Sequence, residues 1–257
     1  MRMQIEELTF SYGEKEAIDH VTLDVNEGEF VGLIGPNGSG KSTVLKNIYR
    51  GLTPDSGTIT LDGENLLKMP HKKSALKMAV VGQENDVPFD FLVEEIVAMG
   101  RAPHKKLFDI DNAQDKKIVH HALEHLGMEH MAKRNYLNLS GGEKQRVIIA
   151  RAIAQECDFF ILDEPTNHLD ISYQIQIFDF IKRLKVTVLS AIHDLNMAAL
   201  YCDRIYVLKE GKLVLQGTPE EVLTSDNIFD VYGVRSSVVK HPITGKMTIT
   251  YLPAGIN

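Results

Sequence analysis

The chain has 257 residues, of which 44% are hydrophobic and 25% are charged, a balance typical of globular proteins that excludes a disordered, collagen-like or disulfide-rich chain. At about 150 residues per domain, this length predicts one or two domains with a core that needs no disulfide bonds. Lysine and arginine number 28 against 35 aspartates and glutamates, so the net charge is −7, which disfavours general binding to nucleic-acid phosphates.

The N-terminal part of the chain carries strand patterns. Apolar residues alternate loosely over 3–10 and strictly over 21–25, with a turn around Gly13 between them, which predicts two strands. A nearly continuous apolar run over 29–34 is typical of a buried parallel strand. It leads into a glycine-rich segment and then into a helical pattern over 44–52.

Residues 88–155 differ in character. Helical periods occur at 91–99, 114–126 and 143–154, with a loop over 100–106 between them, and we interpret this segment as a helical insertion in an α/β core. Further strands are predicted over 58–61, 77–81, 159–162, 186–192, 205–208 and 213–215. Further helices are predicted over 171–184, 219–224 and 225–232, and a small hairpin over 235–239 and 247–252.

The cysteines and the apolar runs indicate the compartment. Cys157 and Cys202 form no CxxC pair, which favours a reducing compartment over a redox or metal site. The first ten residues lack the apolar stretch of a signal peptide, and no apolar run approaches the ~20 residues of a membrane helix. If the protein works at a membrane, we expect another chain to span it.

The glycine-rich segment matches the phosphate-loop pattern GxxxxGK[ST] between a strand and a helix. Its glycines allow the backbone N–H groups to point inward, and the following helix adds its N-terminal partial charge. Lys41 can reach the β- and γ-phosphates, and the Ser42 hydroxyl can bind Mg²⁺. The nucleotide-binding candidates here are Gly35, Asn37, Gly38, Ser39, Gly40, Lys41, Ser42 and Thr43. A plain glycine-rich turn is the alternative that this context disfavours.

A pair of acidic residues follows the buried strand 159–162. Asp163 emerges at the carboxyl end of this strand, where α/β sheets bind ligands, and we expect it to hold Mg²⁺ directly or through water. Glu164, the next residue, can poise water as a general base. A strand that ends in Asp-Glu is commonplace alone, so the prediction depends on the phosphate loop.

The segment Leu139-Ser-Gly-Gly-Glu-Lys-Gln-Arg146 resembles the signature motif of ATP-binding cassette (ABC) proteins. Four further residues match the family pattern in order along residues 1–232: Tyr12 as the aromatic that stacks on adenine, Gln83 of the Q-loop, Asp170 of the D-loop and His193 as the switch histidine. Lys144 stands where relatives often have Gln, outside the phosphate contacts.

The resemblance implies a fold and a reaction. The expected fold is a P-loop ATPase core over 1–232, with a RecA-like mixed sheet, an antiparallel β subdomain and the helical subdomain inserted at about 88–155. Residues 233–257 would form a short C-terminal β-hairpin, too short for a regulatory domain. The implied cofactors are ATP and Mg²⁺. The implied catalytic residues are Glu164, His193 and Gln83, and the implied Mg²⁺ ligands are Ser42, Gln83 and Asp163.

The resemblance also implies a homodimer. In ABC proteins two cassettes close head to tail, so that each signature motif faces ATP on the other copy; here the signature residues are Ser140, Gly141, Gly142 and Glu143. The sequence supports this arrangement, because the signature motif stands at the start of a predicted helix and helix N-termini bind anions. One phosphate loop and one signature motif per chain make two half-sites, which a dimer completes.

A narrower resemblance points to an importer. Residues 97–104, 167–174, 193–199 and 218–223 are similar to ATPases that import ferric siderophores, haem and cobalamin. By this likeness residues 89–104 form the docking groove for integral membrane permease subunits on the cytoplasmic face of the cell membrane. An extracytoplasmic substrate-binding protein would be an indirect partner, and no nucleic acid is expected.

Other readings stay open. A soluble ABC ATPase that acts on DNA or ribosomes is disfavoured by the single cassette, the acidic charge and the lack of a heptad run. An ABC exporter's ATPase differs mainly in the docking segment. His121-Ala-Leu-Glu-His125 matches an inverted zinc-protease motif but lacks an obvious third ligand, so a solvated helix face is favoured. The pairs Lys105-Lys106 and Lys116-Lys117 indicate ordinary solvated charges rather than a lipid-binding surface.

Overall fold

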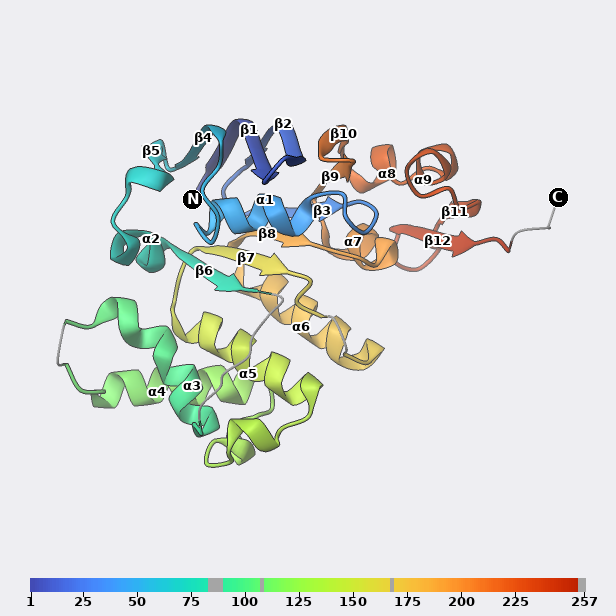
Figure 1. Cartoon of the computed structure of the whole chain (residues 1–257). Helices are drawn as coiled ribbons and strands as arrows, with labels where there is room; N and C mark the ends of the chain where they lie inside the picture. The colour runs from blue at the N-terminus through green and yellow to red at the C-terminus, as the bar shows by residue number, and fades with distance from the viewer. Residues whose placement is uncertain (83–89, 107–108, 167–168, 254–257) are drawn as a thin grey trace. The chain divides into compact units, whose positions relative to one another are not determined.

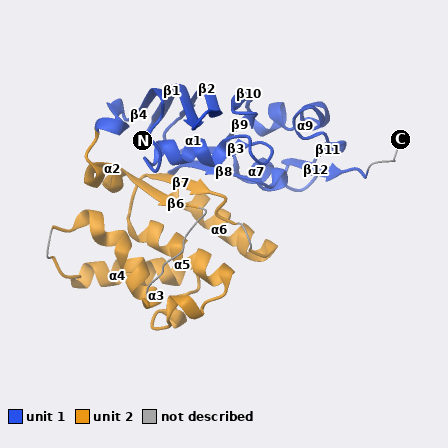
Figure 2. Ribbon diagram, viewed as in Figure 1, with its two compact units in different colours: residues 1–68, 187–257 blue, residues 69–186 orange. Residues whose placement is uncertain are grey.

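The computed structural model describes residues 1–82, 90–106, 109–166 and 169–253. The chain forms two compact units (Figures 1 and 2). The first combines Met1–Lys68 with Thr187–Asn257, and the second is Met69–Val186. The second unit therefore contains the segment 88–155 together with flanking strands and helices. Along the described ranges, no helix is both long and apolar enough to cross a lipid bilayer.

The first unit begins with an antiparallel sheet in the order β2-β1-β4-β5. Its strands are β1 (Met3–Tyr12), β2 (Lys15–Val25), β4 (Ser56–Leu61) and β5 (Glu64–Asn65). The alternation over 3–10 places Met3, Ile5, Leu8 and Phe10 in the core, as a half-buried strand requires. This sheet is the antiparallel β subdomain that the family resemblance implies.

A second sheet in the first unit contains the predicted buried strand. In the order β10-β9-β3-β8, β3 pairs in parallel with both β9 and β8, and β10 is an antiparallel edge strand. These strands are β3 (Phe30–Ile34), β8 (Thr187–Ala191), β9 (Arg204–Lys209) and β10 (Lys212–Gly217). All residues of β3 and β8 are buried, which explains their continuous apolar runs. The mixed sheet confirms the α/β fold.

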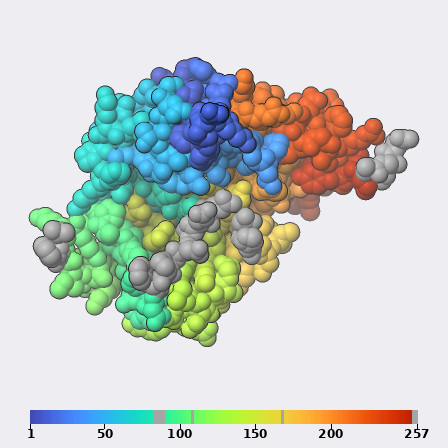
Figure 3. All heavy atoms as spheres, in the orientation of Figure 1, coloured from blue at the N-terminus to red at the C-terminus, as the bar shows by residue number. Residues whose placement is uncertain are grey.

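Helices and a hairpin complete the first unit. Helix α1 (Lys41–Ile48) follows β3, and α7 (Leu195–Tyr201) follows β8. Next come α8 (Pro219–Val222), α9 (Ser225–Tyr232), and the antiparallel strands β11 (Ser236–Lys240) and β12 (Met247–Tyr251). The hairpin lies against α9, and their atoms form a continuous surface (Figure 3).

The second unit packs helices beside two parallel strands, β6 (Met78–Val81) and β7 (Phe159–Asp163). Its helices are α2 (His71–Lys77), α3 (Val93–Ala98), α4 (Ala113–His125), α5 (Gly141–Ala154) and α6 (Ile171–Leu184). Helices α3, α4 and α5 pack on one another through buried side chains that recur at helical spacing, including Val93, Ile96, Val119, Leu123 and Val147.

Three segments show where local prediction from the sequence failed. Residues 100–106 were expected to be a loop, but Met99–His104 forms a 3-10 helix, η2. Helix α2 was missed because it buries only Ser74, so its sequence shows no apolar period. Helix α7 was missed because it has only seven residues, begins shortly after β8 and buries five of the seven, which leaves too short and too uniform a pattern to recognise.

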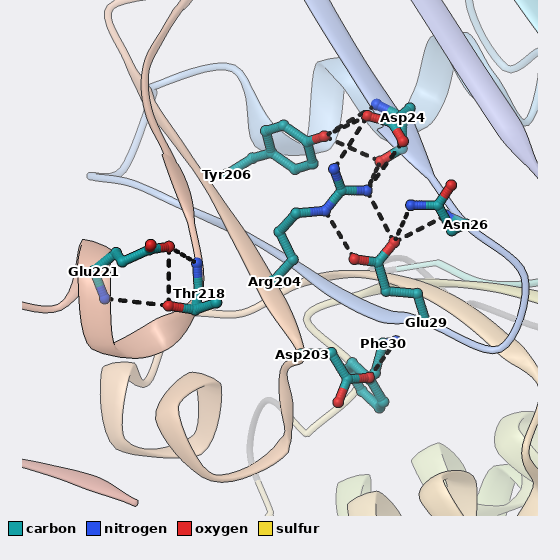
Figure 4. Close-up of polar contacts among 9 residues, drawn as sticks. All are labelled: Asp24, Asn26, Glu29, Phe30, Asp203, Arg204, Tyr206, Thr218 and Glu221. Carbon is teal, nitrogen blue, oxygen red and sulfur yellow. Dashed lines mark hydrogen bonds and ion pairs between the residues drawn. The ribbon is translucent and has the colours of Figure 1, made fainter.

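A polar cluster joins β2, the turn after it, and β9 (Figure 4). The Arg204 guanidinium forms ion pairs with Asp24, at 3.1 Å, and with Glu29, at 2.8 Å. The Tyr206 hydroxyl donates to the Asp24 main-chain carbonyl at 3.1 Å. Hydrogen bonds from Arg204 hold the pKa of Asp24 below its ordinary value of 3.8. The cluster therefore ties the antiparallel sheet to the mixed sheet.

Asp24 should make stability depend on pH in the acid range. Because its folded pKa is lowered, its contribution is present above pH 3.8 and is lost as the pH falls through the folded value. We expect Asp24→Asn to lower the free energy of unfolding at pH 7 by about 1–2 kcal/mol and this deficit to shrink below pH 3.8. Thermal unfolding at pH 7 and pH 3 measures this deficit, and Asp55→Asn on the exposed surface is the control. A deficit that is the same at both pH values contradicts the stabilising role given to the Asp24 carboxylate.

Candidate nucleotide-binding site

The loop between β3 and α1 needs its glycines for both conformation and space. Gly35, Gly38 and Gly40 have φ values of +149°, +77° and +105°, which L side chains rarely adopt. A Cβ on Gly35 would lie 2.0 Å from the Leu208 carbonyl oxygen, and one on Gly40 would lie 2.9 Å from that of Ala17. The loop therefore curls tightly against β9 and β2, with Gly38 on its open side.

Polar groups converge inside this loop. Lys41 is 5% exposed, and its Nζ donates to the carbonyl oxygens of Gly35, at 2.8 Å, and Pro36, at 3.0 Å. Ser39 Oγ is buried and has no hydrogen-bond partner within the described part of the chain. Gly40, the N-cap of α1, offers no side chain to the first N–H groups of the helix. A buried ammonium, a buried hydroxyl and a bare helix N-terminus fit a phosphate chain.

The neighbouring parallel strand, β8, places His193 at the same edge of the sheet as the phosphate loop. Leu33 of β3 pairs with Ala191 of β8, and the Ile192 N–H donates to the Leu33 carbonyl at 3.1 Å. His193 is exposed one residue later, and Asp194 then caps α7 by accepting from the Asn196 and Met197 N–H groups. The phosphate loop and the switch histidine therefore leave adjacent parallel strands at their carboxyl ends.

Tyr12 ends β1 with a half-exposed ring. Its side chain is 50% exposed and meets Phe10 edge-on, with ring centroids 4.9 Å apart. Phe10 is buried, so this contact orients the tyrosine ring from below while leaving it accessible. The arrangement suits an aromatic that stacks on a planar base.

The acidic pair belongs to the second unit. Asp163 is the last residue of β7 and is fully buried. Glu164 has φ of +50°, a left-handed conformation that costs a non-glycine residue about 1–2 kcal/mol. Such strain persists where the surrounding structure imposes it, and it clusters at active sites. The chain thus leaves β7 in a left-handed conformation directly after Asp163.

The signature residues form the N-terminus of α5. Ser140 is the N-cap, and both its N–H and its Oγ donate to Glu143 Oε2 at 2.7 Å. These hydrogen bonds lower the pKa of Glu143. A Cβ on Gly141 would meet nothing within 4 Å. The first turn of α5 is therefore capped by Ser140 and Glu143 but left open beside Gly141.

Asp170 caps the next helix, and two glutamines hold the loop before it. The Tyr173 N–H donates to Asp170 Oδ1 at 3.0 Å. Gln145 Nε2 donates to the Pro165 carbonyl at 2.9 Å, and Gln174 Nε2 donates to the Leu169 carbonyl at 3.1 Å. Sequence analysis missed both glutamines, although Gln145 lies in the signature motif itself. They connect α5 and α6 to the loop that follows Asp163.

The candidate residues are divided between the units. Tyr12, the phosphate loop and His193 lie in the first unit, whereas Asp163, Glu164, the signature residues and Asp170 lie in the second. Gln83 lies outside the described residues, as do Asn167 and His168 of the D-loop segment. Within the first unit, the structure brings together the loop, α1 and the switch histidine.

Comparison with known proteins decides the family. The family model described as ABC transporter matches residues 18–167. The chain belongs to the ABC transporter family. It is 38% identical over 248 residues to the ferric enterobactin transport ATP-binding protein FepC of Escherichia coli K12, covering 95% of this chain and 92% of that one. The family assignment confirms the predicted fold and the predicted ATPase activity.

Two solved structures extend the comparison. A putative metal-chelate type ABC transporter in an inward-facing conformation superposes with a TM-score of 0.84 at 27% identity, covering 98% of each chain. A dimeric ATP-binding cassette bound to ADP and phosphate superposes with a TM-score of 0.76 at 30% identity, covering 84% of this chain and 98% of the other. ABC cassettes therefore bind nucleotide with the architecture described here.

Residues 97–104 of this ABC cassette, whose sequence is similar to importer ATPases, are fixed to α5. Gly100 approaches α5 so closely that a Cβ would lie 2.2 Å from the Arg151 carbonyl oxygen. Buried Arg101 donates to the Ala154 carbonyl at 2.7 Å and pairs with Asp115 at 3.1 Å and Glu156 at 2.8 Å. Burial alone would raise the pKa of Asp115, but the hydrogen bonds it accepts outweigh that and lower it. The segment is thus bonded to its neighbours within the second unit.

The two histidines of the motif that resembles a zinc protease have structural partners in this cassette. His121 Nδ1 lies 3.2 Å from Glu124 Oε2, and the His125 ring lies 4.9 Å from that of Phe180. Both belong to α4 and are engaged within the second unit. Cys157 and Cys202 are buried and form no disulfide bond, and burial raises the pKa of Cys157 to about 12, which leaves little reactive thiolate at neutral pH.

Proposed function

We propose that this chain is the ATP-hydrolysing subunit of an importer for an iron chelate or a related metal complex. The observation that carries the proposal is the identity to a ferric enterobactin transport protein across nearly the whole of both chains. The likeness to a metal-chelate type transporter supports it. So does the Gly100–His104 segment, whose sequence is similar to such importers and which is clamped to α5 through Arg101.

The phosphate loop holds the nucleotide in this proposal. Lys41 binds the β- and γ-phosphates, and the buried Ser39 hydroxyl finds its partner in the bound nucleotide. The hydroxyl of Ser42 and the carboxylate of Asp163, with Gln83, are oxygen donors of the kind Mg²⁺ prefers. When bound, Mg²⁺ neutralises charge on the β- and γ-phosphate oxygens. Tyr12 stacks on the adenine.

Hydrolysis then depends on three residues of this chain. Glu164 accepts a proton from the attacking water as general base, and it follows β7 directly, in a left-handed backbone conformation. His193 holds the γ-phosphate from the edge of the sheet next to the phosphate loop. Gln83 links the metal site to the permease. Removal of the γ-phosphate contact after hydrolysis opens the site, as in other lid-type enzymes.

A second copy of the chain completes each site. Ser140 and the N–H groups of Gly141 and Gly142 cap the γ-phosphate from the partner copy, where the N-terminus of α5 supplies partial positive charge. Glu143 orients Ser140 through the two 2.7 Å hydrogen bonds it accepts. Asp170 lies at the start of α6 in the segment that the family calls the D-loop. The dimeric relative supports this arrangement.

The dimer docks on integral membrane permease subunits at the cytoplasmic face of the cell membrane. The docking groove is the segment 89–104, of which Phe89 lies outside the described residues. A hollow of about 680 Å³ beside this segment is lined by Phe91 and by residues of α3, η2 and α4, including Met99 and Leu123. An extracytoplasmic binding protein delivers the chelate to the permease and does not touch this chain.

Reconstitution with the permease tests the proposal. The complex in lipid vesicles, with the binding protein on the opposite side, should hydrolyse ATP faster when that protein carries its chelate. Ferric catecholates, ferric hydroxamates and cobalamin are compared at matched concentrations, with iron-free chelators as controls. Co-purification of a permease supports the importer. Co-purification with ribosomes or DNA, or stimulation by a cargo loaded on the cytoplasmic side, contradicts it.

A further inference from the structure

The C-terminal hairpin is bonded to the helix that follows the switch histidine. The Ile249 N–H of β12 donates to Asn196 Oδ1 at 2.8 Å, and Asn196 Nδ2 donates to the Ile249 carbonyl at 3.2 Å. The side-chain amide of Asn196 thus satisfies both backbone groups of a strand residue, as a neighbouring strand would. Ile249 is buried, and α7 and β12 lie side by side (Figure 1).

Asn196 is also part of the turn that carries His193. Its own N–H donates to Asp194 Oδ1 at 2.7 Å, and Asp194 directly follows His193. Burial, together with the charge of Asp194, raises the pKa of Tyr251, which also lies on β12. The hairpin is therefore bonded through Asn196 to the turn that carries His193.

We propose that Asn196 is a positioning residue, through which the C-terminal hairpin braces the turn that carries His193. The sheet itself aligns this turn with the phosphate loop only as far as the Leu33–Ala191 pair, and beyond it both segments leave the strands as loops. The two bonds between Asn196 and Ile249 hold the turn at its far end, where α7 begins. Because misplacing a catalytic group by about 1 Å can cost up to 100-fold in rate, such a crosslink matters for turnover. This inference rests on the proposed role of His193 at the γ-phosphate.

Asn196→Leu tests the brace, because leucine has a similar size and makes neither hydrogen bond to Ile249. We expect kcat for ATP hydrolysis to fall about 10-fold. The affinity for ADP should stay within about twofold of wild type, since ADP has no γ-phosphate for His193 to hold. Asn196→Gln, which keeps the amide, should recover part of kcat.

Asn65→Leu is the matched control. Asn65 Oδ1 accepts from the Lys68 N–H at 3.2 Å in the same unit, away from both loops, so its loss should lower stability without changing kcat. The brace is overturned if Asn196→Leu keeps the wild-type kcat, or if it weakens ADP and ATP binding equally in step with a lower Tm. An inactive wild type would overturn the proposed function and this inference together, whereas an active wild type beside a fully active variant overturns the inference alone.

Discussion

Lys41→Ala should abolish nucleotide binding and lower ATP hydrolysis by about 100-fold or more. The Lys41 ammonium is buried inside the phosphate loop and bonded to its carbonyl oxygens. Alanine removes the cation that the phosphates need in a water-poor site, where a single preorganised donor is worth about 100- to 1,000-fold in rate. It also removes two hydrogen bonds that hold the loop. Titration with a fluorescent ATP analogue, with circular dichroism to confirm folding, measures the effect.

Lys46→Ala controls for the loss of a positive charge from the same helix. Lys46 lies in the last turn of α1, so its distance from the phosphate loop leaves only a weak, salt-screened influence on the nucleotide. We expect binding within about twofold of wild type. Nucleotide affinity that survives in Lys41→Ala would show that the loop does not grip the phosphates as proposed.

Glu164→Gln should keep ATP binding while slowing hydrolysis by about 100- to 10,000-fold, the contribution of a general base. The amide has nearly the same shape as the carboxylate but cannot accept the proton. With turnover stalled, the ATP-bound dimer should accumulate. Gel filtration with and without ATP should therefore show a dimer peak only with ATP, and single-turnover kinetics should show unhydrolysed nucleotide in that peak.

The chain offers a control with the same strained backbone. Glu210, in the turn between β9 and β10, also has φ of +50°, so Glu210→Gln makes the same chemical change at the same conformation. It should hydrolyse ATP at the wild-type rate and form no lasting dimer. An unchanged monomer peak for Glu164→Gln in ATP would count against hydrolysis at a shared interface.

The buried strands and the phosphate loop could be predicted because their signals are local. The apolar run over 29–34 and the glycines at 35, 38 and 40 each satisfy a requirement of the backbone nearby, and the left-handed φ values bear this out. The segment 99–104 could not be predicted in the same way. Its helical turn depends on Gly100 approaching Arg151 and on Arg101 reaching Ala154, contacts that no local pattern carries.

The amino-acid sequence by itself determined the family and the ATPase activity of this protein, and it predicted which residues hold phosphate, accept a proton or face a second copy. It did so because these functions require particular side chains at fixed spacings beside a turn or a helix start. Only the tertiary structure decided how the loops are held. Asn196 meets Ile249 across 53 residues of chain, and a hydrogen bond over that separation exists only once the core has brought the hairpin and α7 together.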